Sequence, residues 1–197
     1  MLTANTHHVT VAIPVEAAED GPTFRDLFEK EFAYVRCSAR RLGIREREVE
    51  DLVHEVFLAV HRKLPEFERG RPVRPWLFGI TFRVVAGHKR RLGYYREQLS
   101  TQDEPDEHAD EQPAADETLA TEERRRMVHE ALDSLDDERR AIFILHELDE
   151  VPMAELARAL NIPTNTAYSR LRLARQAFKR SLRRILLSAS RPEEGTT

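Results

Sequence analysis

The chain has 197 residues and a formal net charge of −4, with 31 Lys and Arg residues against 35 Asp and Glu residues. This near balance excludes a uniformly basic nucleic-acid binder, and the length allows one domain or two small ones. The single cysteine, Cys37, excludes an internal disulfide, and the sequence contains neither a membrane-spanning apolar run nor the apolar core of a secretory signal. We therefore expect a cytoplasmic protein.

Apolar side chains recur at helical spacing in two early segments, Thr23–Leu42 and Glu46–Lys63. Residues 1–21, which precede them, show no such period, and we expect them to form a disordered tail. Gly43 and Pro65 stand where the two helices should end, because glycine favours the position after a helix and proline cannot continue one.

The second of these helices has an acidic face opposite its apolar stripe. This face carries Glu50, Asp51, His54 and Glu55. Acidic groups in the N-terminal half of a helix interact favourably with the helix dipole and can simply remain solvated. The same face can also be a docking surface for a basic partner, and the residue types alone leave both interpretations open.

A loop around Gly70 leads into a third helix that should open near Pro72 or Pro75. Trp76 is expected in its core. No acidic residue occurs between Arg69 and Arg96, and a basic loop with aromatic neighbours is typical of sites for an unpaired nucleic-acid strand. The alternative is a basic helix end that complements the dipole. The candidate contact residues are Arg69, Arg71, Arg74, Arg83, His88, Lys89, Arg90 and Arg91.

Residues 93–118 contain almost no apolar side chains, and no lysine or arginine occurs between Glu97 and Glu123. Such a segment cannot bury enough apolar surface to offset the entropy lost on ordering, so we expect a flexible acidic linker. It divides the chain into two helical domains, at residues 22–92 and 119–187, with a C-terminal tail at residues 188–197.

The second domain is expected to contain four helices. The first spans about Leu119–Leu135, and Asp136 can cap a further helix that reaches Leu148. A helix-turn-helix then follows, in which the break at residues 161–163 separates a short helix that begins near Met153 from a long one capped by Thr164.

The long last helix has no acidic residue from Thr164 to Arg184. The residues most nearly opposite its apolar stripe are Asn165, Ser169 and Arg172, close to the helix start, where helix-turn-helix proteins contact bases. The alternative is a basic amphipathic helix with a solvated face. The break, the cap and the one-sided charge together favour DNA binding.

Two blocks of sequence resemble the bacterial RNA polymerase sigma factors. The run Glu50–Phe57 (EDLVHEVF), with Phe67, Gly70 and Trp76–Ile80 (WLFGI), is similar to conserved region 2. The segments that resemble conserved region 4 are Leu132–Leu135, Glu155–Ala157, Ile162-Pro163, Thr166–Leu171 and Ala174-Arg175. Because no further domain lies between the blocks, the chain resembles the small extracytoplasmic-function (ECF) group.

This resemblance implies an all-α protein that binds core RNA polymerase, directs it to promoters and assists DNA melting. The β′ clamp helices would dock on Asp51 and Glu55, with Glu50 and His54 beside them, while the second domain would also hold the β flap. The loop from Phe67 and the helix through Arg91 would bind the melted −10 strand. The resemblance leaves open whether an anti-sigma factor also binds. The residues that would enter the −35 major groove are Asn165, Thr166, Tyr168, Ser169, Arg170, Arg172 and Arg175.

Four positions depart from the family pattern. Sigma factors of this kind usually have glutamine at the position of His54, asparagine at that of Arg83 and aspartate at that of Gly87, and often lysine at that of Tyr168. These departures leave the expected fold intact and bear on which promoter is read.

The sequence carries no enzyme signature. Asp51 and His54 form a carboxylate–histidine pair on one helix, but the second pair of a di-metal bundle is missing, as are a zinc-protease motif, a phosphate-binding loop and a serine-hydrolase motif. We therefore expect no catalytic residues, no metal and no cofactor. The competing interpretation is a stand-alone helix-turn-helix repressor or activator, which would not need the strand-binding loop of the first domain.

Overall fold

A computed structural model describes residues 21–99 and 119–189 of the chain, and these residues form helices and connecting loops without a strand. Almost all of the expected N-terminal tail, most of the expected linker and most of the expected C-terminal tail lie outside the described residues. None of the described helices combines the length and the hydropathy needed to cross a bilayer. The expectation of an all-α fold is confirmed.

The first domain consists of α1 (Phe24–Arg41), α2 (Glu46–Lys63), a 3₁₀ turn η1 (Leu64–Glu66) and α3 (Val73–Leu99). Thr23 caps α1, because its hydroxyl accepts a 3.1 Å hydrogen bond from the amide of Asp26 and the Asp26 carboxylate accepts one from the amide of Thr23. The boundaries of α2 agree with the expected ones. Its apolar stripe is buried, and the ring of Phe57 packs against the rings of Phe24, Phe28 and Phe32.

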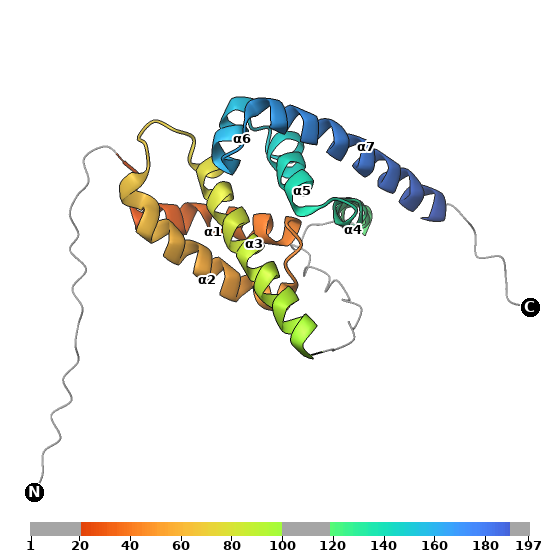
Figure 1. Ribbon diagram of the computed structural model, residues 1–197, viewed down its shortest axis with the longest axis horizontal. Helices are drawn as coiled ribbons and strands as arrows, with labels where there is room; N and C mark the ends of the chain where they lie inside the picture. Colours follow the sequence, from red (N-terminus) through yellow and green to blue (C-terminus); the bar gives the residue numbers. More distant parts are fainter. Residues whose placement is uncertain (1–20, 100–118, 190–197) are drawn as a thin grey trace, which may run out of the picture.

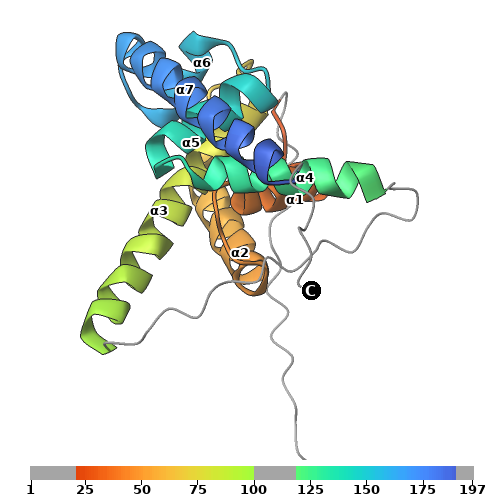
Figure 2. The same ribbon diagram turned by 90° about the vertical axis from the view of Figure 1, so that its right-hand side faces the viewer.

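Helix α3 is longer than the sequence led us to expect. It continues to Leu99, so residues 93–99, which we assigned to the linker, are helical. The reason is that Gly93 alone does not end a helix: a glycine inside one costs roughly 1 kcal/mol relative to alanine, and the good helix formers Arg96, Glu97 and Gln98 follow it. The C-terminal half of α3 projects away from the rest of the molecule in both side views (Figures 1 and 2).

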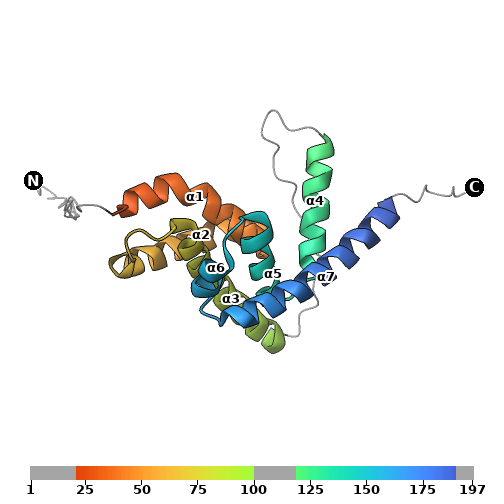
Figure 3. The same cartoon turned by 90° about the horizontal axis from the view of Figure 1, so that it is seen from above.

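The second domain consists of α4 (Leu119–Asp133), α5 (Asp137–Phe143), a π-helical turn η2 (Ile144–Leu148), α6 (Met153–Leu160) and α7 (Thr164–Ala189). Asp136 caps α5 as expected, accepting a 2.9 Å hydrogen bond from the amide of Arg139. Helix α7 packs on α4 and α5, and its C-terminal half extends away from the first domain when the molecule is seen from above (Figure 3).

The turn between α6 and α7 differs from the expected one in a single detail. Asn161 ends α6 in the left-handed conformation, with φ of 55° and ψ of 50°. Thr164 is not the N-cap of α7 but its first residue, because the carbonyl of Pro163 already accepts the first helical hydrogen bond, from the amide of Ala167 at 3.0 Å. The prediction of Thr164 as the cap was therefore wrong by one position.

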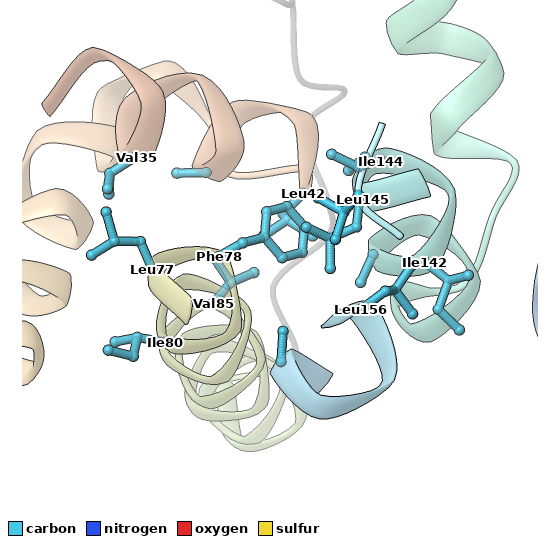
Figure 4. Packing of buried hydrophobic residues seen from close by; sticks show 14 of the residues in the cluster. Val35, Leu42, Leu77, Phe78, Ile80, Val85, Ile142, Ile144, Leu145 and Leu156 are labelled. Atoms are coloured by element: carbon cyan, nitrogen blue, oxygen red, sulfur yellow. The ribbon is translucent and has the colours of Figure 1, made fainter. Parts of the chain in front are cut away.

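The two domains share one apolar core. Buried residues of the first domain, such as Leu42 and Phe78, belong to the same continuous cluster as Leu145 and Leu156 of the second. Figure 4 shows these side chains meeting where α1, α3, η2 and α6 converge. The helix-turn-helix is thus packed against α3 of the first domain rather than held only by the intervening chain.

Candidate nucleic-acid interface

The buried residues of α7 determine which face of the helix is exposed to solvent. Ala167, Leu171 and Ala174 turn inward and are almost fully buried, which fixes how the helix is rotated. The opposite face is open to solvent over the first two turns, and the ring of Tyr168 is 58% exposed there. The predicted recognition residues that the structure places on this open face are Asn165, Tyr168, Ser169 and Arg172.

The remaining predicted recognition residues are half-buried or paired with an acidic residue. Arg170 is half-buried, and its Nη2 lies 2.6 Å from Oε2 of Glu138. Arg175 donates from Nε and Nη2 to Oε1 of Glu147, at 2.9 and 2.7 Å. These glutamates of α5 and η2 orient the two guanidinium groups, a role that the sequence did not reveal because the partners lie 28 or more positions away in the chain. Thr166 is half-buried.

The basic character of α7 continues beyond the recognition face. No residue of the helix is acidic. Four exposed cations follow on its later turns. They are Lys179, Arg180, Arg183 and Arg184.

The loop before α3 presents part of the expected strand-binding site. Arg69 is exposed, and so is most of the side chain of Arg74, which donates a 2.9 Å hydrogen bond to Glu31. The ring of Trp76 packs on the ring of Phe67, with centroids 4.7 Å apart, and is partly buried against the core. Trp76 is therefore largely a packing residue, as expected.

Most of the other predicted strand-binding cations are held by neighbours. On the second domain, Arg71 faces Glu155 at 3.9 Å, Arg83 donates to the carbonyl of Ala159 at 3.3 Å, and Lys89 donates to Asp137 at 2.6 Å. Within the first domain, His88 lies 3.7 Å from Glu48 and Arg91 lies 3.0 Å from Glu55. Arg90 is exposed. The candidates therefore do not form one free basic surface.

The acidic face of α2 is fully displayed. Glu50, Asp51, His54 and Glu55 are all exposed, and a ring nitrogen of His54 lies 2.9 Å from the carbonyl oxygen of Glu50. Leu58 stands on the same face with 64% of its surface exposed. Leu58 was not predicted as a site residue, although a leucine outside the regular apolar stripe of α2 is a signal that could have marked it.

Comparison with known families shows which protein family the chain belongs to. Residues 27–93 match the family model "Sigma-70 region 2", and residues 125–178 match "Sigma-70, region 4". The chain belongs to the RNA polymerase sigma factors of the ECF group. The region 2 match decides against a stand-alone repressor or activator, and this sigma factor therefore acts in transcription initiation.

Curated relatives are similar over most of their length. The chain is 24% identical over 183 residues to the ECF RNA polymerase sigma factor SigW of Bacillus subtilis, covering 83% of this chain and 91% of SigW. It is 28% identical over 171 residues to the ECF sigma factor SigL of Mycobacterium tuberculosis, covering 86% of this chain and 94% of SigL.

Solved sigma factors share the fold. The sigma factor RpoE of Bartonella quintana, in complex with the anti-sigma factor NepR, matches with a TM-score of 0.68 and 22% identity over 81% of this chain and 96% of RpoE. CnrH in complex with the cytosolic domain of CnrY matches with a TM-score of 0.57 and 24% identity, over 85% of this chain and 89% of CnrH.

Proposed function

We propose that this sigma factor divides its contacts among three surfaces. The acidic face of α2, defined by Glu50, Asp51, His54 and Glu55, docks on core RNA polymerase at the β′ clamp helices. The exposed start of α7 enters the −35 major groove. The basic loop before α3, together with the basic side of α3, binds the melted −10 strand, and the second domain also holds the β flap.

The observation that carries this proposal is the open face at the start of α7. Its four exposed predicted residues follow a left-handed helix end at Asn161, and their opposite side is locked into the core by alanines and a leucine. A rigid, one-sided presentation of donors at a helix N-terminus suits readout of base edges in a major groove.

The acidic face supports the polymerase part of the proposal. The interaction of the carboxylates with the helix dipole does not explain why a leucine is exposed beside them. Leu58 adds apolar area to the charged face, which a protein partner could cover. A charged rim around an apolar contact is the usual composition of a protein interface.

The experiment that tests this function is promoter-directed transcription by the assembled holoenzyme. Core polymerase with the full-length chain would be incubated with fragments of genomic DNA, and the start sites of the transcripts would be mapped. We expect starts that share one pair of upstream elements and that disappear without the sigma factor. Transcripts without common elements would contradict the proposal.

Polymerase docking is tested separately by charge reversal. The double change Asp51→Lys and Glu55→Lys should weaken binding to core polymerase and leave the melting temperature unchanged. The matched control reverses two other exposed carboxylates, Glu29 and Glu130, and should bind normally. Equal binding by both double variants would show that the acidic face of α2 is only solvated surface.

An anti-sigma factor is a further partner that we propose, since the structural match RpoE was solved with the anti-sigma factor NepR.

The proposed location is the cytoplasm, where polymerase works, and the proposed activity includes no catalysis by the chain itself. Affinity capture of the full-length chain from its own cells, followed by mass spectrometry, should recover polymerase subunits; recovery of none of them would contradict this assignment.

A further inference from the structure

Tyr168 is an aromatic side chain on an otherwise polar surface. The open face at the start of α7, which we call the recognition face, is formed by Asn165, Tyr168, Ser169 and Arg172. Among the described residues, large hydrophobic side chains are exposed at five positions, and Tyr168 is the one that lies on this face. Because the core does not use the ring for packing, the ring is available to a partner.

The buried side of the helix fixes the direction of this ring. Ala167 and Leu171, one residue before and three residues after Tyr168, are at most 3% exposed. They set the rotation of α7, so the Cα–Cβ bond of Tyr168 points away from the core. Tyrosine has only two rotatable side-chain bonds, and its ring therefore offers a large contact area at a low entropic cost. A partner that approaches the recognition face meets the ring directly.

The polar neighbours of Tyr168 differ in how far the protein itself engages them. The hydroxyl of Ser169 donates a 2.9 Å hydrogen bond to the carbonyl oxygen of Asn165, so it is occupied within the helix. Within the described part of the chain, the side chains of Asn165, Tyr168 and Arg172 make no hydrogen bond or ion pair. Their spacings of three and four residues align them along one side of the helix. They form the available row of the recognition face.

Each member of this row matches a different feature of the major groove. Asparagine pairs best with adenine and arginine with guanine, because each can make two hydrogen bonds to one base. A ring between them matches the 5-methyl group of thymine, the apolar group that the major groove exposes. Tyr168 and Arg172 are about 6 Å apart along the helix axis, and base pairs are stacked about 3.4 Å apart. The ring therefore reaches a pair within about two steps of the one that Arg172 meets.

We propose that Tyr168 selects a thymine in the −35 element by contact between its ring and the 5-methyl group. This inference rests on the proposed function, because it requires the recognition face to enter the −35 major groove. Burial of one methyl-sized apolar group corresponds to about fourfold in affinity. The competing role is a hydrogen bond from the Tyr168 hydroxyl to a phosphate, which would carry no sequence information.

The test removes single methyl groups from the DNA. Duplex promoter fragments from the start sites mapped for this sigma factor would be synthesised with each thymine of the −35 element, on either strand, replaced in turn by deoxyuridine. Deoxyuridine lacks only the 5-methyl group and keeps the hydrogen bonds of the base pair. Holoenzyme with the full-length chain would be titrated against each fragment at a fixed salt concentration.

Four variants would be compared with the wild type. Tyr168→Phe keeps the ring and removes the hydroxyl, Tyr168→Ala removes both, and Tyr168→Lys replaces the ring by a flexible chain with three donors. Gln176→Ala is the matched control, because Gln176 is exposed on the same helix eight residues further on, outside the recognition face. Since position 168 is exposed, none of its changes should lower the melting temperature of the free chain.

We expect one thymine at which deoxyuridine lowers the affinity of the wild-type holoenzyme about fourfold. Tyr168→Phe and Gln176→Ala should show the same loss at the same position. Tyr168→Ala and Tyr168→Lys should bind the thymine and deoxyuridine fragments equally there, because the partner of the methyl group is gone.

A failure of this inference differs from a failure of the proposed function. Specific binding without a deoxyuridine-sensitive thymine, or a sensitivity that persists in Tyr168→Ala, would overturn the methyl contact alone. Loss of the sensitivity in Tyr168→Phe would also overturn it and assign the contact to the hydroxyl. Binding that no base change within the −35 element affects would overturn the proposed function of the recognition face.

Discussion

The hydroxyl of Tyr34 donates a 2.8 Å hydrogen bond to Oδ2 of Asp149, across a separation of 115 positions in the chain. Burial, together with the neighbouring carboxylate, raises the pKa of Tyr34, so the phenol stays protonated and remains a donor. This bond ties α1 of the first domain to the segment that leads into the helix-turn-helix. The side chain of Asp149 is only 11% exposed, so this bond is largely shielded from water.

Removal of this hydroxyl should weaken the fold. Tyr34→Phe keeps the ring and takes one donor from a shielded carboxylate, and hydrogen bonds to charged groups contribute about 1.5–3 kcal/mol. We expect the free energy of unfolding of the full-length chain in urea to fall by about 1.5 kcal/mol. Tyr168→Phe, which alters an exposed ring, is the control and should change nothing. Equal midpoints for Tyr34→Phe and wild type would contradict the prediction.

The ionisation of Asp149 should make the free energy of unfolding depend on pH. Burial raises the pKa of Asp149 above its ordinary value of 3.8, and the bonds from Tyr34 and Arg41 only partly offset this effect. The folded protein therefore holds the proton more tightly than the unfolded chain does. It follows that the contribution of Asp149 to stability declines as the pH rises from 3.8 through the raised pKa.

Asp149→Asn isolates this effect, because a neutral amide does not titrate. The free energy of unfolding would be measured for both proteins at a series of pH values above and below 3.8. We expect the difference between them to shift in favour of the variant as the pH rises. A constant difference would show that the bonds to Asp149 balance the burial of the carboxylate, and one that shifts in favour of the wild type would show that they outweigh it.

Local patterns predicted the helices because local spacing determines them. The stripe of α2 and the cap at Asp136 are properties of neighbouring residues, and both were predicted correctly. The end of α3 was missed because Gly93 resembles a stop signal, while the decision rests on the helix formers after it. The one-residue error at Thr164 arose because a side-chain cap was expected where a proline carbonyl begins the helix.

The site was less predictable than the fold. The open face of α7 follows from its apolar stripe, so the exposure of Asn165 and Arg172 could be expected. The partners of Lys89 and Arg170 are acids from distant segments, and no spacing rule connects them. Packing of the two domains against each other likewise depends on Gly79 meeting α6, a tertiary event without a signature in the local sequence.

Leu58 provides a further prediction about polymerase binding. Its side chain is 64% exposed beside the acidic face, and burial of such a group against a partner contributes on the order of 1 kcal/mol. Leu58→Ser should therefore weaken binding of the full-length chain to immobilised core polymerase by roughly fivefold, with no loss in melting temperature. Leu58→Met keeps the apolar volume and should bind like wild type. If the serine variant also binds like wild type, Leu58 lies outside the interface.

We predict that Glu147 orients the guanidinium group of Arg175 for DNA binding. It accepts two hydrogen bonds from Arg175 and so fixes the direction of that guanidinium. Glu147→Gln removes the charge but keeps an acceptor, whereas Glu147→Ala removes both. We expect the alanine variant to bind duplex promoter DNA less tightly and the glutamine variant to retain most of the affinity. Tighter binding by both variants would instead show that Glu147 competes with DNA for Arg175.

The last prediction separates base readout from phosphate contact along α7. Arg172 is exposed opposite the buried stripe, whereas Lys179 lies seven residues further on, about two turns away. Loss of a base-specific pair costs about 1–3 kcal/mol of discrimination at one position, while loss of a phosphate contact weakens all sequences alike. Arg172→Ala should therefore relax preference at one base pair of the −35 element. Lys179→Ala should lower affinity for every sequence and reduce the salt slope by about one.

Holoenzyme binding to single-base variants of one of its own promoters, at several salt concentrations, distinguishes the two effects. The comparison is internal, because each variant serves as the control for the other on the same DNA panel. A uniform loss across the panel for Arg172→Ala would mean that its guanidinium meets phosphate rather than a base. In that case α7 would enter the groove on a different side, and the exposed ring of Tyr168 would become the leading candidate for base contact.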